Sequence, residues 1–308
     1  MRTIEIGGTV AGVSLAGGGR YLLVADGRDG ADVISVARAE AGAPHPVLGV
    51  LKEPARARLG GAGAIEVASS PDGHYVFVSL EGGAQLTVYD LQAALADQFR
   101  VSAYVGSVGV GLLPVGIAVS PDGRWLYATS EIAQGAHTRA GYRGSHGTLS
   151  VISIATAERD PAAAVVATVS AHCSPVRVAV SPDGNTVWLT ARGDDQLLAF
   201  SAAKLRSRPA HALLAAVRVG AAPVGLAVVD AGRDIVVANS NRFSASGAHS
   251  SLTVVNAAAA LAHRSAIVGT IPAGSFPRDM SAEPDVDTLV VANFASRQFE
   301  TVNVSSLP

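Results

Sequence analysis

The chain has 308 residues, of which 23 are Lys or Arg and 25 are Asp or Glu, so its formal net charge is −2 at pH 7. This near-neutral balance offers no basic field that would attract nucleic acid. An apolar fraction of 49% with only 16% charged residues excludes a disordered chain kept in solution by its charge. The 33 glycines, roughly 11% of the chain against an ordinary ~7%, predict many tight turns.

A segment that ends in Ser-Pro-Asp-Gly recurs along the chain. Copies at residues 64–73, 114–123 and 175–184 nearly superimpose, and weaker copies occupy 10–19, 223–232 and 277–286. The equivalent turn position falls at residues 17, 71, 121, 182, 230 and 284. Since these positions are about 53 residues apart, the chain divides into six repeats.

Each repeat has the pattern of four short antiparallel strands. An apolar strand leads into the turn, where Pro presets φ, Gly tolerates positive φ and the Asp side chain caps its own backbone. A second strand, rich in β-branched and aromatic residues, follows the turn. In chain order the second strands are expected at 75–78, 125–127, 186–189, 235–237 and 289–291, the third at 86–89, 149–152 and 252–255, and the fourth at 165–169, 216–219 and 267–271. Four such strands in a repeat of this length predict a propeller blade.

The two ends of the chain bear on closure of the propeller. The sixth repeat ends with its third strand, at 299–304, and the segment Thr-Ile-Glu-Ile at 3–6 can supply the missing fourth strand. Such pairing would hide two exposed sheet edges. Short Ala/Leu stretches at 90–95 and 256–261 predict single helical turns. We therefore predict an all-β fold: one six-bladed β-propeller domain over residues 1–308, with four-stranded blades and a ring closed by the N-terminal strand.

The N-terminus and the single cysteine bear on the compartment. The first residues contain no apolar stretch or cleavage site of a signal peptide, and no long apolar run predicts a membrane span. We expect a cytoplasmic protein, although a trimmed secreted chain would begin in the same way. Cys173 is the one cysteine, so no internal disulfide can form.

The repeats carry a family resemblance. The pattern Pro-x-Gly-Ile-Ala-Val-Ser-Pro-Asp-Gly-x-x-x-Tyr-Val-x-Asn is best matched by residues 114–130 and 223–239. It resembles the YVTN β-propeller repeat and the lactonase-type propellers that share this turn. The resemblance covers essentially the whole chain and implies the blades; the family includes lactonase-like hydrolases, subunits of cofactor enzymes and binding proteins. Lactonase-type relatives usually have seven blades, whereas the spacing here gives six.

Long loops between the second and third strands predict a functional face at one end of the blades. The longest loops are 130–147 and 239–250, and the link 171–174 between repeats lies at the same end. Side chains suited to substrate binding gather there: His137, Tyr142, His146, His172, Arg242 and His249. The four histidines could ligate a divalent metal, since imidazole suits Zn, Cu, Fe or Ni. His137 and His146 have no standard ligand spacing, so the alternative is that the histidines are simply solvated. A divalent metal therefore stays a candidate, and we predict no other cofactor.

A second set of candidates comes from the innermost strands. The position of Gly116 is occupied by a charged residue in three repeats: Glu66, Arg177 and Asp279. Innermost strands line the central channel, so these side chains could meet at its mouth, with Arg278 beside Asp279. We interpret Glu66, Asp279 and Arg177 as candidate catalytic residues, with a carboxylate as general base and Arg177 and Arg278 as anchors for an anionic or carbonyl group. Ion pairs that merely stabilise the ring are the structural alternative.

These patterns lead to three functional hypotheses. The first is a small-molecule enzyme with its pocket at the channel mouth; the family resemblance implies a hydrolase or lactonase, with a lyase or cyclase as variants. The second is a non-catalytic scaffold for a protein partner, and the third is a binding protein for a small ligand without turnover. In each case we expect neither nucleic acid nor a membrane as a partner.

Overall fold

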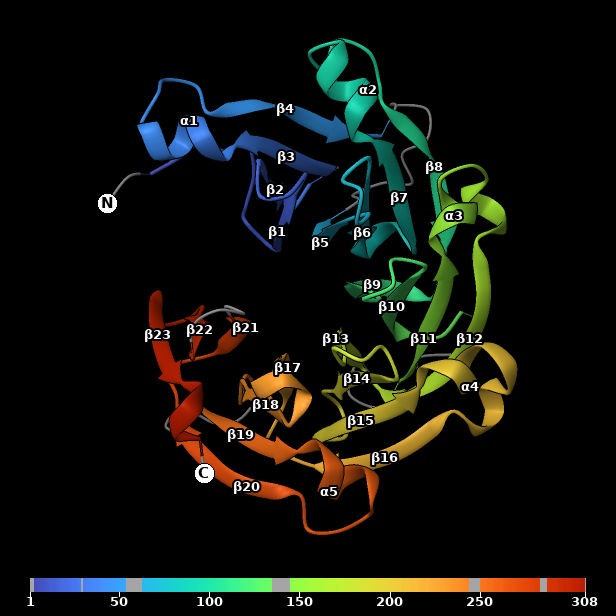
Figure 1. Ribbon diagram of the computed structural model, residues 1–308, viewed down its shortest axis with the longest axis vertical. Helices are drawn as coiled ribbons and strands as arrows, with labels where there is room; N and C mark the ends of the chain where they lie inside the picture. Colours follow the sequence, from blue (N-terminus) through green and yellow to red (C-terminus); the bar gives the residue numbers. More distant parts are fainter. Residues whose placement is uncertain are drawn as a thin grey trace. The chain divides into compact units, whose positions relative to one another are not determined.

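In residues 3–28, 30–53, 63–134, 145–243, 250–282 and 287–307, which the computed structural model describes, the chain forms six antiparallel sheets. Within each sheet the strands are neighbours in the order of the chain (Figure 1). Each sheet is a blade, and the fold is the six-bladed β-propeller that the repeats predict. No helix in these ranges is long and apolar enough to cross a bilayer.

The first three sheets come from the N-terminal half of the chain. Their strands are β1 Val13–Ala16, β2 Tyr21–Ala25, β3 Gly30–Ser35 and β4 Val47–Lys52; β5 Ala64–Ser69, β6 Tyr75–Leu80, β7 Gln85–Asp90 and β8 Tyr104–Gly109; and β9 Leu112–Val119, β10 Trp125–Ile132, β11 His146–Ser153 and β12 Val165–Cys173.

The last three sheets follow the same order. Their strands are β13 Pro175–Val180, β14 Thr186–Ala191, β15 Gln196–Ser201 and β16 Leu213–Arg218; β17 Pro223–Val229, β18 Asp234–Asn239, β19 Ser251–Asn256 and β20 Ile267–Pro272; and β21 Pro277–Ala282, β22 Thr288–Asn293 and β23 Gln298–Asn303.

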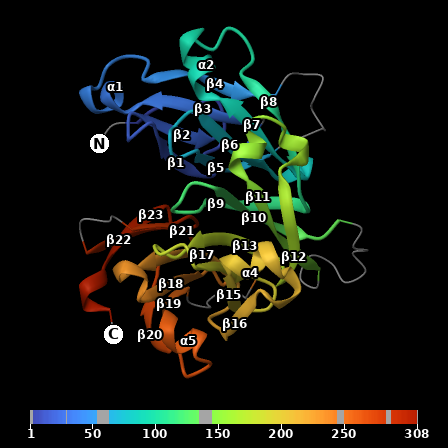
Figure 2. The same ribbon diagram turned by 45° about the vertical axis from the view of Figure 1, so that its right-hand side comes forward.

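Short helices connect the third and fourth strands of the first five sheets, at the outer edge of each sheet (Figure 2). They are α1 Val36–Ala41, α2 Leu91–Ala96, α3 Ile154–Ala157, α4 Ala202–Ser207 and α5 Ala257–Leu261. The helical turns predicted at 90–95 and 256–261 are α2 and α5. Asp90 and Asn256 are their N-caps, and the side-chain oxygens of these residues accept hydrogen bonds from Ala93 N and Ala259 N.

The chain divides into two compact units: residues 1–134 with 150–168, and residues 135–149 with 169–308. The first unit contains β1 to β10, the second contains β13 to β23, and β11 and β12 belong partly to each. Our expectation of one domain over residues 1–308 stays a prediction.

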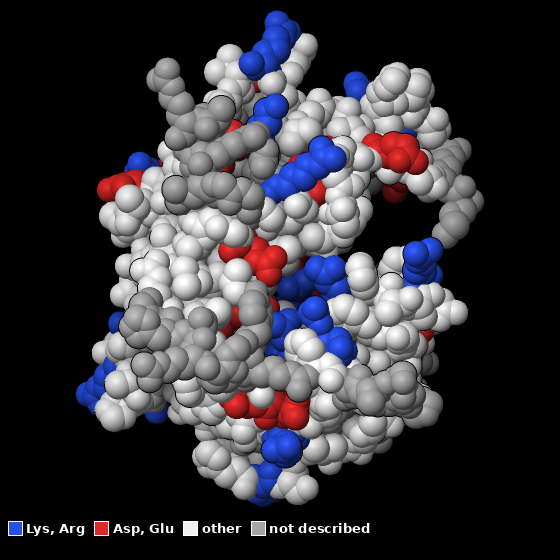
Figure 3. Space-filling view, turned by 180° about the vertical axis from the view of Figure 1, so that it is seen from behind, with Lys and Arg blue, Asp and Glu red and all other residues white. Residues whose placement is uncertain are grey.

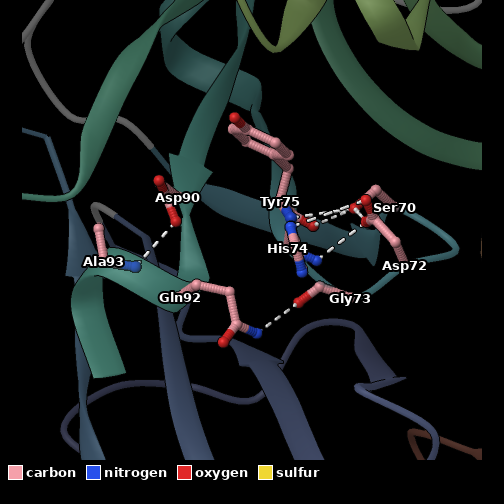
Figure 4. A network of polar contacts seen from close by, with 8 residues as sticks. All are labelled: Ser70, Asp72, Gly73, His74, Tyr75, Asp90, Gln92 and Ala93. Atoms are coloured by element: carbon pink, nitrogen blue, oxygen red, sulfur yellow. Dashed lines mark hydrogen bonds and ion pairs between the residues drawn. The ribbon is translucent and has the colours of Figure 1, made fainter. Parts of the chain in front are cut away.

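A hydrogen-bonded network closes the Ser-Pro-Asp-Gly turns, as Figure 4 shows for the turn between β5 and β6. Ser70 Oγ donates to Asp72 Oδ1 at 2.5 Å, and Asp72 Oδ1 also accepts from His74 N at 3.0 Å. Tyr75 N donates back to Ser70 Oγ at 2.9 Å. The turns at Ser120–Asp122 and Ser181–Asp183 repeat these contacts. The aspartates therefore serve the turn itself, as the sequence pattern predicts.

The glycines of these turns also let neighbouring sheets approach. Gly123 has φ +69°, and a Cβ placed on it would lie 2.5 Å from Pro71 Cγ of the preceding turn. A Cβ on Gly232 would lie 3.1 Å from Pro182 Cδ in the second unit. The turn of one sheet thus packs directly on the turn of the sheet before it, and only glycine fits there.

The apolar core lies between adjacent sheets. Val33 and Leu51 of the first sheet pack in one cluster with Val78 and Tyr89 of the second, and all four are buried. Corresponding clusters join the second and third sheets, the fourth and fifth, and the fifth and sixth. Strands that are buried on both faces explain the near-continuous apolar runs in the sequence.

The N-terminal segment differs from the prediction. In the described ranges the sixth sheet has three strands, and residues 3–6 belong to no strand. Thr9 N donates to Asp26 O at 2.8 Å and Ala11 N donates to Ala25 O at 3.1 Å, which binds this segment to the first sheet. Residues 3–5 border a cavity of about 510 Å³ with the end of α1 and the start of β4. Within the first unit, the segment is therefore held beside its own sequence neighbours.

Candidate functional site

The charged inner-strand position coincides with a β-bulge in each sheet that carries it. The pairing register shifts between Ala64 and Glu66, between Pro175 and Val178, and between Pro277 and Asp279. A bulge re-aims the side chain beside it, and bulges are common next to active sites. The same shift occurs next to Gly116 and between Pro223 and Leu226, around Gly225. The irregular pairing is therefore a feature of the inner strands, shared by charged residues and glycines at this position.

In the second unit, three inner strands bring these positions side by side. Thr190 of β14 connects β13 to β17. Its Oγ1 accepts a hydrogen bond from Arg177 N of β13 at 3.1 Å and donates one to Val224 O of β17 at 2.7 Å. A Cβ on Gly225 would lie 2.9 Å from Arg278 O and 3.4 Å from the Cα of Asp279, so β17 and β21 are in close contact. Arg177, Gly225 and Asp279 therefore form a row of cation, glycine and carboxyl, which we call the inner row.

The two charged members of the inner row differ in exposure. Arg177 is 7% exposed. Asp279 is partly exposed, and its side-chain Oδ1 accepts a hydrogen bond from Met280 N at 3.0 Å. A partly exposed carboxylate that accepts a hydrogen bond from its own strand can also accept a proton from a bound molecule.

A continuous chain of arginine and phenylalanine side chains lies at the end of the second unit where β14, β18 and β22 finish and β21 begins. We call it the Arg–Phe ladder; its members in order of contact are Arg192, Phe243, Arg242, Phe276, Phe294 and Arg278.

The contacts of the ladder are cation–π contacts and one edge-to-face ring pair. The guanidinium carbon Cζ of Arg192 lies 5.5 Å from the centre of the Phe243 ring. Cζ of Arg242 lies 5.2 Å from the centre of the same ring and 5.1 Å from the centre of the Phe276 ring. Phe276 and Phe294 have centroids 5.6 Å apart with planes at 72°, and Arg278 lies 5.1 Å from the ring of Phe294. Such contacts fix the orientation of a guanidinium while its charge is kept. Figure 3 shows Lys and Arg side chains gathered together on one face.

Glu66, the third charged inner-strand residue, belongs to the first unit. It is 9% exposed, and its backbone N–H donates to Ser79 Oγ at 2.9 Å. Its carboxylate occupies the space beside Gly12, where any Cβ would collide with Glu66 Oε1. Glu66 borders a cavity of about 540 Å³ along β1, β5 and β9, together with the turn glycines 17–19. Its meeting with Arg177 and Asp279 stays a prediction.

The predicted histidines form no common site in the described ranges. His146 is exposed at the start of β11. His172 Nδ1 lies 3.0 Å from Gln196 Oε1 and 3.7 Å from Asp194 Oδ2. His137, Tyr142 and His249 lie outside the described residues. Within those ranges no group of three His, Cys, Asp or Glu side chains could hold a metal ion.

Cys173 has the environment of an unreactive thiol. Burial, followed by a hydrogen bond to the Asp194 carboxylate and the negative charge of that group, raises the pKa of the thiol to about 11. Cys173 N also donates to Asp194 Oδ2 at 2.8 Å. A thiol with this pKa is protonated at neutral pH and is a poor nucleophile.

The sequence reasoning missed four members of the ladder: Arg192, Phe243, Phe276 and Phe294. A signal was present, because Arg and Phe recur together in loops at one end of the blades, as Arg242-Phe243 and as Phe276 two residues before Arg278. That pattern shows itself only when the loops are grouped by the end of the blade from which they project.

Comparison with known proteins agrees with this fold. The family described as "Lactonase, 7-bladed beta-propeller" matches residues 2–241. Hydrazine synthase of Kuenenia stuttgartiensis is similar in structure with a TM-score of 0.70 and 15% identity, over 96% of this chain and 84% of that one. The periplasmic gluconolactonase PpgL of Pseudomonas aeruginosa gives a TM-score of 0.63 and 21% identity, over 97% and 74% of the two chains. No curated protein matches the chain.

Proposed function

The chain belongs to the lactonase family of β-propellers, and on that premise we propose that it is a hydrolase that opens the cyclic ester of an anionic substrate. The inner row of the second unit is the reactive centre in this proposal. The Arg–Phe ladder next to it holds the substrate.

The observation that carries the proposal is the inner row. It sets the buried Arg177 on β13 and the partly exposed Asp279 on β21, with Gly225 of β17 between them, where the strand pairing is irregular in all three sheets. The guanidinium supplies fixed donors for an oxyanion, and the carboxylate supplies a base. Both groups lower the barrier to ester hydrolysis.

The proposed reaction begins with water. Asp279 accepts a proton from the water molecule as the water oxygen attacks the carbonyl carbon of the lactone. Arg177 stabilises the negative charge that develops on the carbonyl oxygen. The bond between the carbonyl carbon and the ring oxygen then breaks, the ring oxygen takes the proton back from Asp279, and the product is a hydroxy acid.

Glu66 is the second candidate base. It borders the larger of the two cavities described above, and that cavity lies entirely among residues of the first unit. Substitutions of Glu66 and Asp279 separate the two assignments, because each residue belongs to a different unit.

The experiment is a titration of acid release by the purified full chain. The substrates are five- and six-membered lactones, each with and without a carboxylate substituent. We expect hydrolysis of the carboxylate-bearing lactones, at least tenfold faster in kcat/KM than of their neutral counterparts, which corresponds to about 1.4 kcal/mol. Acid release no faster than in buffer alone, for every lactone, would contradict the proposal.

A further inference from the structure

Arg242 stands at the middle of the Arg–Phe ladder and has few partners. Its guanidinium lies 5.2 Å from the centre of the Phe243 ring and 5.1 Å from that of Phe276. In the described ranges it makes no ion pair; its remaining contact is a backbone hydrogen bond from its N–H to Ser240 Oγ at 3.4 Å. The side chain is exposed. An exposed arginine held only by two ring faces keeps its N–H donors directed along its edge.

The ladder separates Arg242 from Arg278. Two phenylalanine rings, Phe276 and Phe294, lie between the two guanidiniums in the sequence of contacts. Arg278 directly precedes Asp279 of the inner row. One guanidinium can donate a bidentate pair of hydrogen bonds to one carboxylate, so Arg278 and Arg242 can each hold an anion of its own.

The phenylalanines keep these two positions fixed. Phe243 is 41% exposed and Phe294 is 53% exposed, although exposure of such large apolar side chains is unfavourable. Their rings hold arginine side chains in place instead of filling the core. A guanidinium ordered in advance loses less conformational entropy when it binds an anion.

We propose that the Arg–Phe ladder selects substrates that carry a second anionic group. Arg278 binds the anion nearest the reacting ester and Arg242 binds the other. That the bound dianion is a substrate rests on the proposed function. The selective binding of dianions does not depend on turnover. Carboxylate and phosphate share the required chemistry, and the test distinguishes them.

The test measures binding by calorimetry to the full chain, with three acids of similar length. Glutarate carries two carboxylates, 4-phosphonobutyrate carries one carboxylate and one phosphonate, and valerate carries one carboxylate. We expect the dissociation constant of glutarate or of 4-phosphonobutyrate to be at least tenfold lower than that of valerate. The tighter of the two dianions identifies the second group.

Three variants assign that selectivity to the ladder. Arg242→Gln keeps a planar hydrogen-bonding group without the charge, and it should reduce the advantage of the dianion over valerate to about twofold or less. Phe276→Leu keeps apolar volume without the ring, and it should reduce the same advantage several-fold. Arg264→Gln, at an exposed arginine after α5 in the same unit, should leave the ratio unchanged.

The outcomes separate this inference from the proposed reaction. Equal affinity for glutarate, 4-phosphonobutyrate and valerate overturns the inference, as does absence of measurable binding by all three. A merely structural ladder would lower the melting temperature in Arg242→Gln and leave the ratio of affinities intact, which also overturns it. Dianion selectivity that Arg242→Gln abolishes, in a protein that hydrolyses no lactone, supports the inference and rejects the reaction.

Discussion

Asp32 on β3 is a buried carboxyl in the core of the first unit. The residue is 2% exposed, and in the described ranges its Oδ2 has no hydrogen-bond partner. Burial raises its pKa, the negative charge of Asp26 raises it further, and Arg28 lowers it in part. The ionised form of this side chain is therefore less favoured in the folded protein than in the unfolded chain.

The raised pKa of Asp32 makes a prediction about stability against pH. Because the folded pKa lies above the unfolded value, the stabilising contribution is present at low pH and is lost as pH rises through the folded pKa. Asp32→Asn should therefore increase the free energy of unfolding at pH 7.5 by about 1 kcal/mol, the order of the cost of an unmet buried polar group.

Urea unfolding at pH 7.5 and pH 4.5 checks this prediction. The increase in the free energy of unfolding that Asp32→Asn brings should be smaller at pH 4.5 than at pH 7.5. Asp160→Asn, at an exposed position without a capping hydrogen bond, should show no such gain. A variant that is less stable than the parent at pH 7.5 would mean that the ionised carboxylate is stabilised after all.

Cys173 makes a second prediction at the scale of one residue. With a pKa of about 11 its thiolate fraction at pH 8 is small. Iodoacetamide should modify it about a hundredfold more slowly than a cysteine in a short peptide at that pH, and Cys173→Ala should retain the catalytic activity. Mass spectrometry over time measures the rate; modification as fast as in the peptide would refute the assigned environment.

At the scale of the element, the turn glycines carry two separate constraints. Gly123 needs its positive φ and also needs the space next to Pro71. Gly18 has φ +66°, and a Cβ added there would meet no other part of the described chain within 4 Å, so it needs only its φ. The pair separates backbone strain from packing.

Alanine substitutions at these two glycines should differ in cost. Gly18→Ala should destabilise the protein by about 1 kcal/mol through φ alone, and Gly123→Ala should cost more because its methyl group also meets Pro71. Adding Pro71→Ala to the Gly123→Ala variant should recover part of the difference. Thermal unfolding of the parent and these three variants measures the loss of stability in each. An equal loss of stability in the two single glycine variants would show that the turns do not pack on one another.

Most strands could be predicted from the sequence because local chemistry determines each of them. The second strand expected at 75–78 is β6 Tyr75–Leu80, and the third strand expected at 299–304 is β23 Gln298–Asn303. Pro, Asp and Gly mark the turn between strands, and β-branched runs mark the strands themselves. The segment 3–6 also has β-branched residues, but its place depends on the hydrogen bonds of Thr9 and Ala11 to the first sheet. Local patterns carry no information on that choice.

The candidate site was predictable in part for the same reason. Alignment of repeats singled out Arg177 and Asp279 because a charge replaces an expected glycine there. The bulges and the Arg–Phe ladder could not be derived in that way. A bulge depends on the register between two strands, and the ladder joins loops of three blades that are distant in the chain.

At the scale of the whole molecule, the blade number sets this chain apart from the description of its family. The matched family is described as seven-bladed, whereas the described ranges hold six sheets, and the match ends at residue 241, within the fifth. The inner row and the ladder include residues of the sixth sheet, Arg278 and Asp279, beyond the matched range. The substrate selection that we propose thus depends in part on residues that the family match does not cover, since a shared fold does not by itself carry a shared site.

The kinetics of Asp279→Asn, Arg177→Gln and Glu66→Gln on a carboxylate-bearing lactone that the parent hydrolyses test whether the inner row is the reactive centre. We predict that Asp279→Asn and Arg177→Gln each lose at least a hundredfold in kcat, as expected on loss of a general base or an oxyanion donor, while Glu66→Gln stays within a few-fold of the parent. All three variants should keep the melting temperature of the parent within a few degrees. An unchanged kcat in Asp279→Asn would contradict the assignment of the reaction to the inner row, and a selective loss in Glu66→Gln would move it to the first unit.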